Sequence, residues 1–313
     1  MALSNNAVAP YDATALAAFI NEVWSTIVLE PKFEGLTVIN FVRDLSEFMS
    51  EGGDICHVPS IFTNLFAVST QTTQTNAITD QSPDAVDTTL TIATHKYVAW
   101  IIGDRDMRQM ASKYSLNERY VSEASRLLLQ TIEDALFGLY TSIITNTTGD
   151  VAGVITDLHV RTAIQKLQSS NGQTFSTSEM AFFVDPASYW LQLAAIQKYY
   201  DKSINGRDSI VQAGNFGSMG NASSSWGGTL YNVPVYITPR VVKVVNVAKN
   251  LLLTRDALGF AVQNLGANRV RTQVQYWLPN LATLAVVDIL FGVGVLREPA
   301  SVLVNSLTTS TTA

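Results

Sequence analysis

Few side chains in this sequence could perform chemistry, and their spacing matches no catalytic or metal-binding motif. His57, His95 and His159 are the only histidines, and Cys56 is the only cysteine. A single cysteine excludes an intrachain disulfide and a zinc site built on cysteines. His57 and His95 lie on stretches that we expect to form the two strands of one hairpin, where their imidazoles could meet. Without a placed third ligand this pair makes a weak metal site, so cross-strand packing is the preferred interpretation.

Motifs for nucleophilic catalysis and phosphate binding are also missing from the sequence. It contains no Gly-x-Ser-x-Gly nucleophile elbow, and GSMG at residues 217–220 is similar to one in spacing only. It contains neither a Walker-type Gly-Lys-Ser/Thr nor a Gly-x-Gly-x-x-Gly after a strand, and GVG at 292–294 is too short a match. The adjacent Glu133 and Asp134 are expected on the solvated face of a helix, where they need no catalytic role. We therefore expect no enzymatic activity and no cofactor.

The composition describes a folded protein with few charges. Hydrophobic residues make up 47% of the 313 residues, enough for a substantial core, whereas charged residues make up only 15%. Ordinary soluble domains contain roughly 25% charged residues, which keep their surfaces soluble and apart. We infer that copies of the chain cover much of its surface. Lys and Arg number 20 against 26 Asp and Glu, a net charge of −6, and the most basic concentration is the scattered Arg240, Lys243 and Lys249. This argues against a protein that binds nucleic acid strongly.

No segment of the sequence indicates a secretory signal or a transmembrane helix. The N-terminal sequence MALSNN lacks the positive start and apolar run of a secretory signal. The most apolar late stretch, residues 281–296, is interrupted by Asp288 and is too short to cross a bilayer. The sequence favours a protein that is made in a reducing cytoplasm and stays out of membranes.

The first element we expect is an amphipathic helix close to the N-terminus. Its apolar face repeats at helical spacing and consists of Leu16, Phe19, Ile20, Val23, Trp24, Ile27 and Val28. Asp12 or Thr14 can cap its start, and Pro31 ends it. An extended stretch at residues 33–42 is expected to follow. Such a helix is either an arm that lies on another molecule or an ordinary packing helix of the core, and the sequence leaves both open.

A long projecting hairpin is expected next. A turn at residues 51–54 leads into a short strand at 55–59, and strict alternation predicts a longer strand at 90–102. Residues 63–85 between them contain no Lys or Arg and are rich in Thr, Gln and Asn. A connection of this length is unusual inside a compact domain. We interpret it as a hairpin tip that rests on a neighbouring molecule, because an isolated hairpin is only marginally stable. The alternative is a disordered surface loop.

The strongest helix signal lies at residues 115–145. The sequence SLNE at 115–118 matches a capping box, and apolar residues then recur along one face from Val121 through Leu128 to Ile143. At ~1.5 Å per residue this helix would be about 45 Å long, which exceeds the usual length in globular proteins. We expect it to be the spine of a domain.

The remainder of the chain mixes short helices, strands and glycine-rich loops. Helices are expected at residues 160–168 and 186–199, with a flexible connection at 214–228. Strands are expected at residues 180–184, 230–238, 251–254, 260–263, 270–277 and 284–296. Because the strand at 230–238 contains a proline, we place it at a sheet edge or a bulge.

Four short motifs give this order of elements a family resemblance. They are VRDLS at residues 42–46 running into GDICHVP at 53–59, VAWIIGD at 98–104, FFVDP at 182–186 with YWL at 189–191, and GTLYNVPVY at 228–236. Their order and spacing resemble the capsid proteins of tailed phages that share the HK97 fold. In the last motif Asn232 stands where that family usually has glycine, and Asn tolerates similar backbone angles.

The resemblance covers nearly the whole chain and implies an α+β, HK97-like capsid fold. Its parts would be an N-terminal arm, an E-loop hairpin, a peripheral domain with a long spine helix, and an axial domain. The implied divisions are residues 1–49 for the arm and the start of the peripheral domain, 50–103 for the E-loop hairpin, 104–150 for the peripheral domain with the spine helix, 151–268 for the axial domain, and 269–313 for the return to the peripheral domain and the C-terminal tail.

The function implied by the resemblance is structural. Many copies would form the hexamers and pentamers of an icosahedral phage head, assembled in the host cytoplasm. The head would enclose double-stranded DNA without sequence-specific binding. Contacts between subunits are expected from the arm, the hairpin and the spine helix. The candidate contact residues are Phe19, Trp24, Leu65, Phe66, Ile78, Glu118 and Arg126.

The resemblance also implies partner proteins. No long segment precedes the arm, so we expect a separate scaffolding protein, together with a portal and a decoration protein. Residues 63–85 contain no lysine, so we expect no lysine cross-link of the kind that joins subunits in some relatives. Three alternatives stay open. They are an encapsulin-like shell around a cargo enzyme, a ring or tube of a tail or portal, and an α+β hydrolase, which the missing nucleophile motif disfavours.

Overall fold

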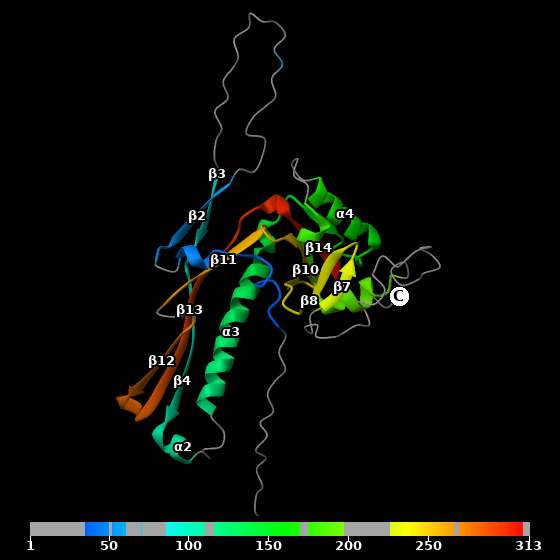
Figure 1. Ribbon diagram of the computed structural model, residues 1–313. Helices are drawn as coiled ribbons and strands as arrows, with labels where there is room; N and C mark the ends of the chain where they lie inside the picture. The colour runs from blue at the N-terminus through cyan, green and yellow to red at the C-terminus, as the bar shows by residue number, and fades with distance from the viewer. Residues whose placement is uncertain are drawn as a thin grey trace, which may run out of the picture.

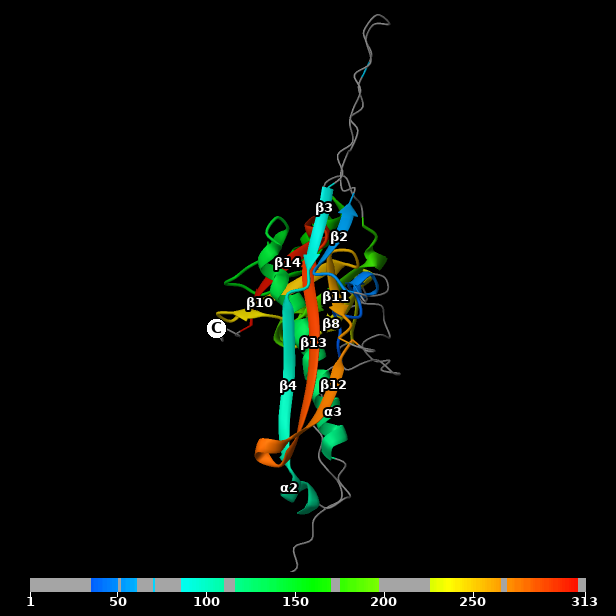
Figure 2. The same ribbon diagram turned by 90° about the vertical axis from the view of Figure 1, so that its left-hand side faces the viewer.

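A computed structural model describes residues 35–49, 52–60, 70, 86–109, 116–169, 175–196, 226–265 and 269–308. An elongated sheet and one long helix stand beside a more compact unit of sheet and helices, and a two-stranded hairpin rises above the elongated sheet (Figure 1). Seen from the side, the elongated sheet lies in front of the long helix (Figure 2). The predicted helix at residues 16–28 and most of the predicted hairpin tip at 63–85 lie outside the described residues.

Five strands form the elongated sheet: β1 (Arg43–Asp44), β4 (Thr94–Gly103), β11 (Leu258–Gln263), β12 (Arg271–Trp277) and β13 (Ala282–Val295). β13 is central. It pairs antiparallel with β4 along residues 282–291, and along its other side with β12 and then β11. β1 adds in parallel to β11. The short helix α2 (Asp104–Gln109) follows β4, and the 3-10 turn η8 (Leu278–Asn280) joins β12 to β13.

The predicted spine helix lies against one face of this sheet. α3 (Leu116–Gly138) continues into the 3-10 turn η4 (Leu139–Ser142), so the predicted end at about residue 145 is slightly too late. The predicted cap at residue 115 lies outside the described residues. Leu128 and Ile132 of α3 are buried in one cluster with Val287 and Ile289 of β13. Each large side chain buried in this way stabilises the fold by about 1.5–3 kcal/mol.

Seven strands form the second sheet: β5 (Thr147–Gly149), β6 (Met180–Val184), β7 (Trp226–Leu230), β8 (Val233–Ile237), β9 (Lys243–Val244), β10 (Val247–Thr254) and β14 (Ser301–Leu307). Their order is β5-β14-β10-β6-β8-β7, and β9 pairs with β10. The helical elements of this unit are α4 (Asp157–Gln168), the 3-10 turn η5 (Thr177–Glu179), α5 (Pro186–Ser188), the π-helical turn η6 (Tyr189–Leu193) and the 3-10 turn η9 (Glu298–Ala300).

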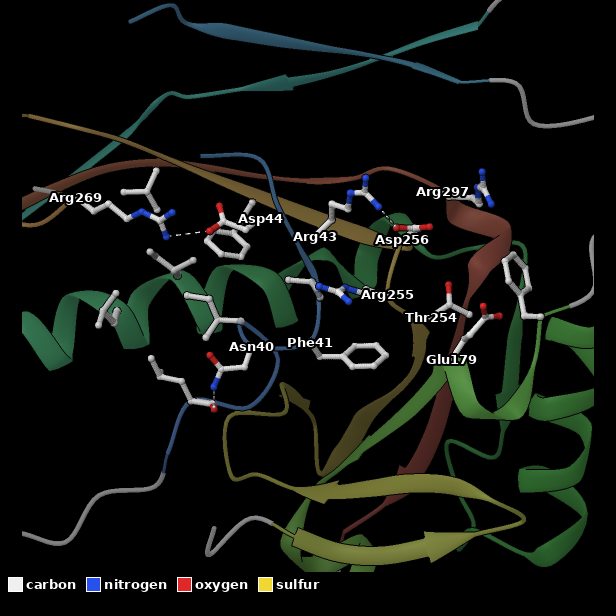
Figure 3. A pocket seen from close by; sticks show the side chains of 18 of the residues that line it. Asn40, Phe41, Arg43, Asp44, Glu179, Thr254, Arg255, Asp256, Arg269 and Arg297 are labelled. Atoms are coloured by element: carbon white, nitrogen blue, oxygen red, sulfur yellow. Dashed lines mark hydrogen bonds and ion pairs between the residues drawn. The ribbon is translucent and has the colours of Figure 1, made fainter. Parts of the chain in front are cut away.

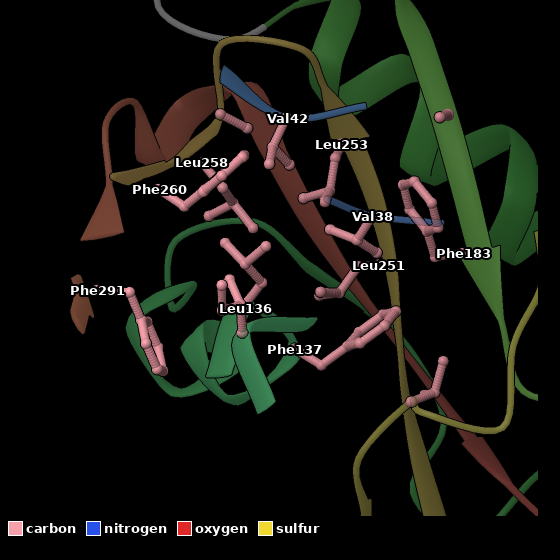
Figure 4. Packing of buried hydrophobic residues seen from close by; sticks show 14 of the residues in the cluster. Val38, Val42, Leu136, Phe137, Phe183, Leu251, Leu253, Leu258, Phe260 and Phe291 are labelled. Atoms are coloured by element: carbon pink, nitrogen blue, oxygen red, sulfur yellow. The ribbon is translucent and has the colours of Figure 1, made fainter. Parts of the chain in front are cut away.

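The strand β6 shows that the second sheet is buried on both faces. All five of its residues are buried, which confirms the predicted buried strand at 180–184. Ala181 and Phe183 belong to the core cluster that contains the spine helix, whereas Phe182 and Val184 belong to the cluster beneath α4. Because successive side chains of a strand point to opposite faces, a strand with a core on both sides is continuously apolar. In the first cluster Phe183 packs near Phe137 of α3, with their ring centroids 6.2 Å apart (Figure 4).

The root of the predicted hairpin differs from the expectation. β2 (Ile55–Ser60) pairs with β3 (Val86–Thr91) in a separate two-stranded sheet. The predicted single strand at 90–102 is wrong, because the chain leaves β3 at Ile92 and continues as β4 in the elongated sheet. The crossing is tight, since a Cβ atom at Gly292 of β13 would overlap the Thr91 carbonyl oxygen. Side-chain alternation continues through this corner, so the two-residue period could not locate it.

Three smaller expectations are corrected as well. Residues 38–42 form turns, so this part of the predicted extended stretch is wrong. Up to residue 196, where the described range ends, the helix predicted at 186–199 consists of the short α5 and η6. The strand predicted at 230–238 comprises the end of β7, a turn and β8. β8 lies inside the sheet between β6 and β7, so the predicted edge position is wrong, whereas the register shift in its pairing with β7 agrees with the alternative of a bulge. The turn residues Tyr231 and Asn232 have φ of 52° and 65°, so Asn232 adopts the left-handed conformation that glycine would adopt.

Candidate assembly surfaces

The structure describes two of the predicted contact residues. The others lie outside the described residues: Phe19, Trp24, Leu65, Phe66 and Ile78. Glu118 and Arg126 both lie on α3, where Glu118 is exposed and Arg126 is half-buried. Arg126 donates through Nε to Glu123 at 3.0 Å, and this hydrogen bond holds the pKa of Glu123 below its usual value. Arg126 is thus tied to its own helix, and its contact with a second subunit stays a prediction.

The two histidines predicted to face each other lie in different sheets. Nδ1 of His57 on β2 is 2.5 Å from Oδ2 of Asp87 on β3. Nε2 of His95 on β4 is 3.0 Å from Oδ2 of Asp288 on β13. The predicted packing of His57 against His95 is therefore wrong, and each histidine instead contacts a carboxylate within its own sheet. Within the described ranges, no group of three or more His, Cys, Asp and Glu side chains could hold a metal ion.

Asp288 connects three strands of the elongated sheet. Its side chain is 5% exposed and accepts hydrogen bonds from Arg271 of β12, whose Nε is 3.0 Å away, and from His95 of β4. The hydrogen bond from Arg271 holds the pKa of Asp288 below its ordinary value, although burial acts in the opposite direction. A buried carboxylate is costly unless it is paired. Because the partners of Asp288 come from β12 and β4, the network holds both strands to β13 at this position. The sequence showed Asp288 only as a break in an apolar run.

The face of the elongated sheet that is turned away from α3, toward the viewer in Figure 2, carries exposed apolar side chains. The register places Ile101 of β4 opposite Leu284 of β13, and Ile101 is 51% exposed. Val98 and Trp100 alternate with these side chains and pack against the core on the other face. We name as the outer-face patch Ala99, Ile101, Trp277, Leu284 and Val286. Contiguous exposed apolar surface is typical of an interaction site.

A buried carboxylate on the spine helix holds the first residues of the described chain. Glu133 is 1% exposed. Its Oε1 accepts hydrogen bonds from Thr37 Oγ1 at 2.7 Å, from the Thr37 N–H at 3.0 Å and from the Val38 N–H at 3.3 Å. The expectation that Glu133 lies on the solvated face is wrong, whereas its neighbour Asp134 is exposed and pairs with Arg240. We call this set of hydrogen bonds the Glu133 clamp. It fixes the place where the chain leaves α3 toward its N-terminus.

A cavity of about 1170 Å³ opens beside the Glu133 clamp, between α3, residues 36–44 and the turn that joins β10 to β11 (Figure 3). We call it the arginine-lined cavity. Its charged lining residues are Arg43, Asp44, Glu179, Arg255, Asp256, Arg269 and Arg297. Arg43 pairs with Asp256 at 3.0 Å, and Arg269 pairs with Asp44 at 2.9 Å. No pattern in the sequence indicates this basic cluster, because its arginines lie far apart along the chain.

The lining of the arginine-lined cavity is also partly apolar. Half-buried side chains contribute to its wall and pack against the core, namely Ile39, Phe41, Leu129 and Phe175. A second cavity of about 630 Å³ lies beside β2 and shares Arg43, Asp256 and Arg297 with the first. The two cavities therefore meet at the Arg43–Asp256 pair, between the spine helix and the hairpin root.

Comparison with known proteins gives a match in structure and none in sequence. No model of a protein family matches the chain, and no curated protein matches it. A chain of Mycobacterium phage Che8 has a TM-score of 0.68 at 14% identity, covering 91% of this chain and 97% of that one. The capsid of the cyanophage P-SCSP1u has a TM-score of 0.69 at 11% identity, covering 92% and 93%. The SrpI encapsulin of Synechococcus elongatus has a TM-score of 0.61 at 14% identity, covering 98% and 99%.

These likenesses extend over nearly the whole length of both chains, so they define the fold. The chain has the α+β HK97 fold, which phage capsids and encapsulin shells share. The predicted fold class is thereby confirmed. The described helices include none that is long and apolar enough to cross a membrane.

Proposed function

We propose that the chain is the major capsid protein of a tailed phage. Many copies would form the hexamers and pentamers of a closed icosahedral shell around double-stranded DNA. The observation that carries this proposal is the HK97 fold over nearly the whole chain, with likeness to chains from several phages. A fold can serve more than one function, so the surface of this chain has to supply further support.

The hairpin root supplies the first support. β2 and β3 pair only with each other in the described part of the chain, and Leu90, Cys56 and Met49 anchor their base in a small apolar cluster. A two-stranded sheet is marginally stable in water. The pair of β2 and β3 therefore gains stability if it lies on a neighbouring subunit.

The outer-face patch supplies the second support, because it leaves apolar side chains of β4 and β12 exposed in the single subunit. Burying such surface against another copy contributes ~25 cal/mol per Å². Each contact is weak alone, but a subunit that contacts several neighbours at once is held strongly. The low content of charged residues agrees with a surface that is largely covered in this way.

Electron microscopy of the purified protein tests the proposal directly. We expect closed icosahedral particles, and nuclease-protected double-stranded DNA in particles from infected cells. Closed particles that enclose a protein cargo and no DNA would favour the encapsulin alternative, to which the likeness to SrpI points. Rings or open tubes would favour a tail or portal component. A folded monomer that never assembles would contradict every shell function.

The partner proteins form a separate part of the proposal. A scaffolding protein, a portal and a decoration protein would act with the chain during assembly in the host cytoplasm. A scaffold would follow from the proposed shell, because one sequence would have to form both hexamers and pentamers of a defined particle size. Expression of the chain alone and together with the neighbouring genes of its phage would test this. We expect irregular particles alone and uniform particles with the partners.

A further inference from the structure

We propose that the arginine-lined cavity binds the N-terminal segment of the same chain, residues 14–30, while the subunit is unassembled. The segment would lie with its apolar side on the cavity wall and its carboxylates at the arginines. This docking is separate from the shell function and would occur within a single subunit. The wall of the cavity, its charges and the position of Gly35 beside it support the docking.

The wall of the cavity suits an amphipathic ligand. Ile39, Phe41, Leu129 and Phe175 are each only half-buried by the described chain, although they pack against the core on their other side. A volume of about 1170 Å³ has room for several large apolar side chains. A DNA duplex fits poorly here, because it is bound by continuous basic surfaces and not by a concave apolar wall.

The charges of the cavity are available to a ligand. The members of the Arg43–Asp256 and Arg269–Asp44 pairs are about half exposed, and exposed pairs of this kind contribute little, so they can exchange partners. The side chain of Arg255 is exposed, and it forms no hydrogen bond or ion pair with the other described residues. In Figure 3 its side chain lies between the Arg43–Asp256 pair and Phe41. Four arginines against three carboxylates leave the cavity with an excess of positive charge.

The N-terminal segment has the complementary chemistry. Its apolar residues recur at helical spacing from Leu16 to Val28. Within residues 14–30 the only charged residues are two carboxylates, Glu22 and Glu30. An acidic amphipathic segment can bind in such a groove by packing its apolar face on the apolar wall and directing its carboxylates toward the arginines.

The position of the first described residues favours the same chain as the source of the segment. Leu36 and Ile39 line the cavity, and the Glu133 clamp holds Thr37 beside it. Residues 31–34, which separate the segment from Gly35, can span about 14 Å at ~3.4 Å per residue, so residues 14–30 can reach the cavity. A tethered segment has a high effective concentration at its site, which favours it over a separate molecule.

This docking would have a consequence for assembly that rests on the proposed function. The segment contains Phe19 and Trp24, which we expect to contact neighbouring subunits in the shell. In the single subunit the cavity would cover these side chains, and assembly would release them to a neighbour. The apolar side chains of the segment would thus be covered until assembly, and this would protect the unassembled subunit from aggregation.

Photo-cross-linking of the full-length chain tests the inference. A benzophenone amino acid replaces Phe175, and light and heavy-isotope preparations of the protein are mixed while unassembled. We expect cross-links from position 175 to peptides within residues 14–30, and we expect both partners of each link to carry the same isotope. The same probe at Leu278, which is exposed at the far end of the elongated sheet, should give no such link.

Charge variants sharpen the test. Arg255→Glu should lower the cross-linking yield several-fold, whereas Arg105→Glu, on exposed α2, should leave it unchanged. Adding Glu22→Lys and Glu30→Lys to Arg255→Glu should restore the yield, because the charges are again opposite. Links to residues beyond 1–34, links of mixed isotope, links to nucleic acid, no link at all, or an unchanged yield in Arg255→Glu would overturn the inference. Electron microscopy of the same proteins scores particle formation independently, so failure of the cross-link leaves the shell function standing.

Discussion

Glu133 is a buried side chain whose contribution can be isolated by substitution. In Glu133→Ala the Thr37 hydroxyl and the Thr37 and Val38 N–H groups lose their common acceptor. We expect the free energy of unfolding to fall by about 2–4 kcal/mol, because unsatisfied buried donors are costly. Urea denaturation of the unassembled chain measures it. The neighbouring Asp134→Ala removes only an exposed ion pair and should cost less than ~1 kcal/mol; equal losses in the two variants would contradict the clamp.

Val245 has a backbone conformation that is unfavourable for valine. It lies at the tip of the β9–β10 hairpin, is 88% exposed, and has φ of 47°. The left-handed region costs a residue with a Cβ roughly 1–2 kcal/mol and is especially unfavourable for a β-branched one. Val245→Asn should therefore raise the melting temperature of the unassembled chain, with a gain of about 1 kcal/mol. Val244→Asn, placed in a strand, should give no gain, and a gain of similar size there would show that exposure and not backbone conformation is the cause.

At the scale of single residues, features that depend on neighbouring residues could be predicted from the sequence. Features that depend on distant residues could not. The left-handed conformation of Asn232 was predictable, because a motif and a backbone preference coincide there. The burial of Glu133 was not, because its partners are almost a hundred positions away and charge normally indicates an exposed helix face. The same holds for the arginine-lined cavity, whose charged residues come from five separate segments.

At the scale of elements, the crossing of the hairpin over β13 depends on one glycine. A Cβ atom at Gly292 would overlap backbone of Thr91, whereas at Gly294 the nearest atom would be Cδ1 of Leu90 at 3.5 Å, an ordinary contact. Gly292→Ala should lower the free energy of unfolding by roughly 2–3 kcal/mol, since neither backbone can move away without breaking the pairing. Gly294→Ala should change it by less than ~1 kcal/mol. Urea denaturation of both variants tests the difference, and a tolerated Gly292→Ala would mean that the corner is looser than the structure shows.

The network of Asp288 predicts how the elongated sheet responds to acid. The pKa of Asp288 is lowered below 3.8 in the folded chain, chiefly by the hydrogen bond from Arg271. A group with a lowered folded pKa stabilises the protein above its unfolded pKa, and this contribution is lost as the pH falls through the folded pKa. Asp288→Asn should therefore be less stable than the parent near neutral pH, and the difference should shrink at pH values below 3.8. Urea denaturation along a pH series measures this, and a constant difference would exclude the linkage.

A helix or strand could be predicted from the sequence where its apolar residues followed a single pattern along its whole length. The spine helix, the strands β6 and β11, and the second half of β10 follow from an apolar stripe or a continuous apolar run, whereas the first half of β10, which contains Lys249 and Asn250, was not predicted. The boundary between β3 and β4 was not predictable, because the same alternation continues from one sheet into the next. The pairing of His95 with β13 could not be predicted for the same reason, because this pairing depends on which sheet β4 joins.

For the whole molecule, the outer-face patch predicts a variant that folds but does not assemble. Ile101→Glu places a charge in the middle of the patch, on a side chain that is already half exposed in the single subunit. We expect the free energy of unfolding to change by less than ~0.5 kcal/mol, and particle yield to fall roughly tenfold or more, because a charge buried at an interface is costly. Particle counts by electron microscopy, beside urea denaturation, measure both. Gln165→Glu, which adds the same charge to the exposed side of α4, should assemble normally, and normal assembly of Ile101→Glu would remove the patch from the proposed contacts.

The overall architecture was predictable from the order of motifs, although each motif is short. The resemblance placed a hairpin before a spine helix and a second sheet after it, and the structure has this order. The residue divisions of the four parts stay predictions. The sequence could not show that β11 and β13 bring distant segments back beside the spine helix, because strand pairing is decided by the whole core and not by local pattern.

The segment from Thr37 to Met49 has a mechanical consequence. At one end it is fastened to α3 by Glu133, in the middle the Leu45 N–H donates to the Phe260 carbonyl, and at the other end Met49 is buried in the base of the hairpin. It therefore links α3 mechanically to the base of the hairpin. A force applied at Gly35 would be transmitted through this segment to the base of β2.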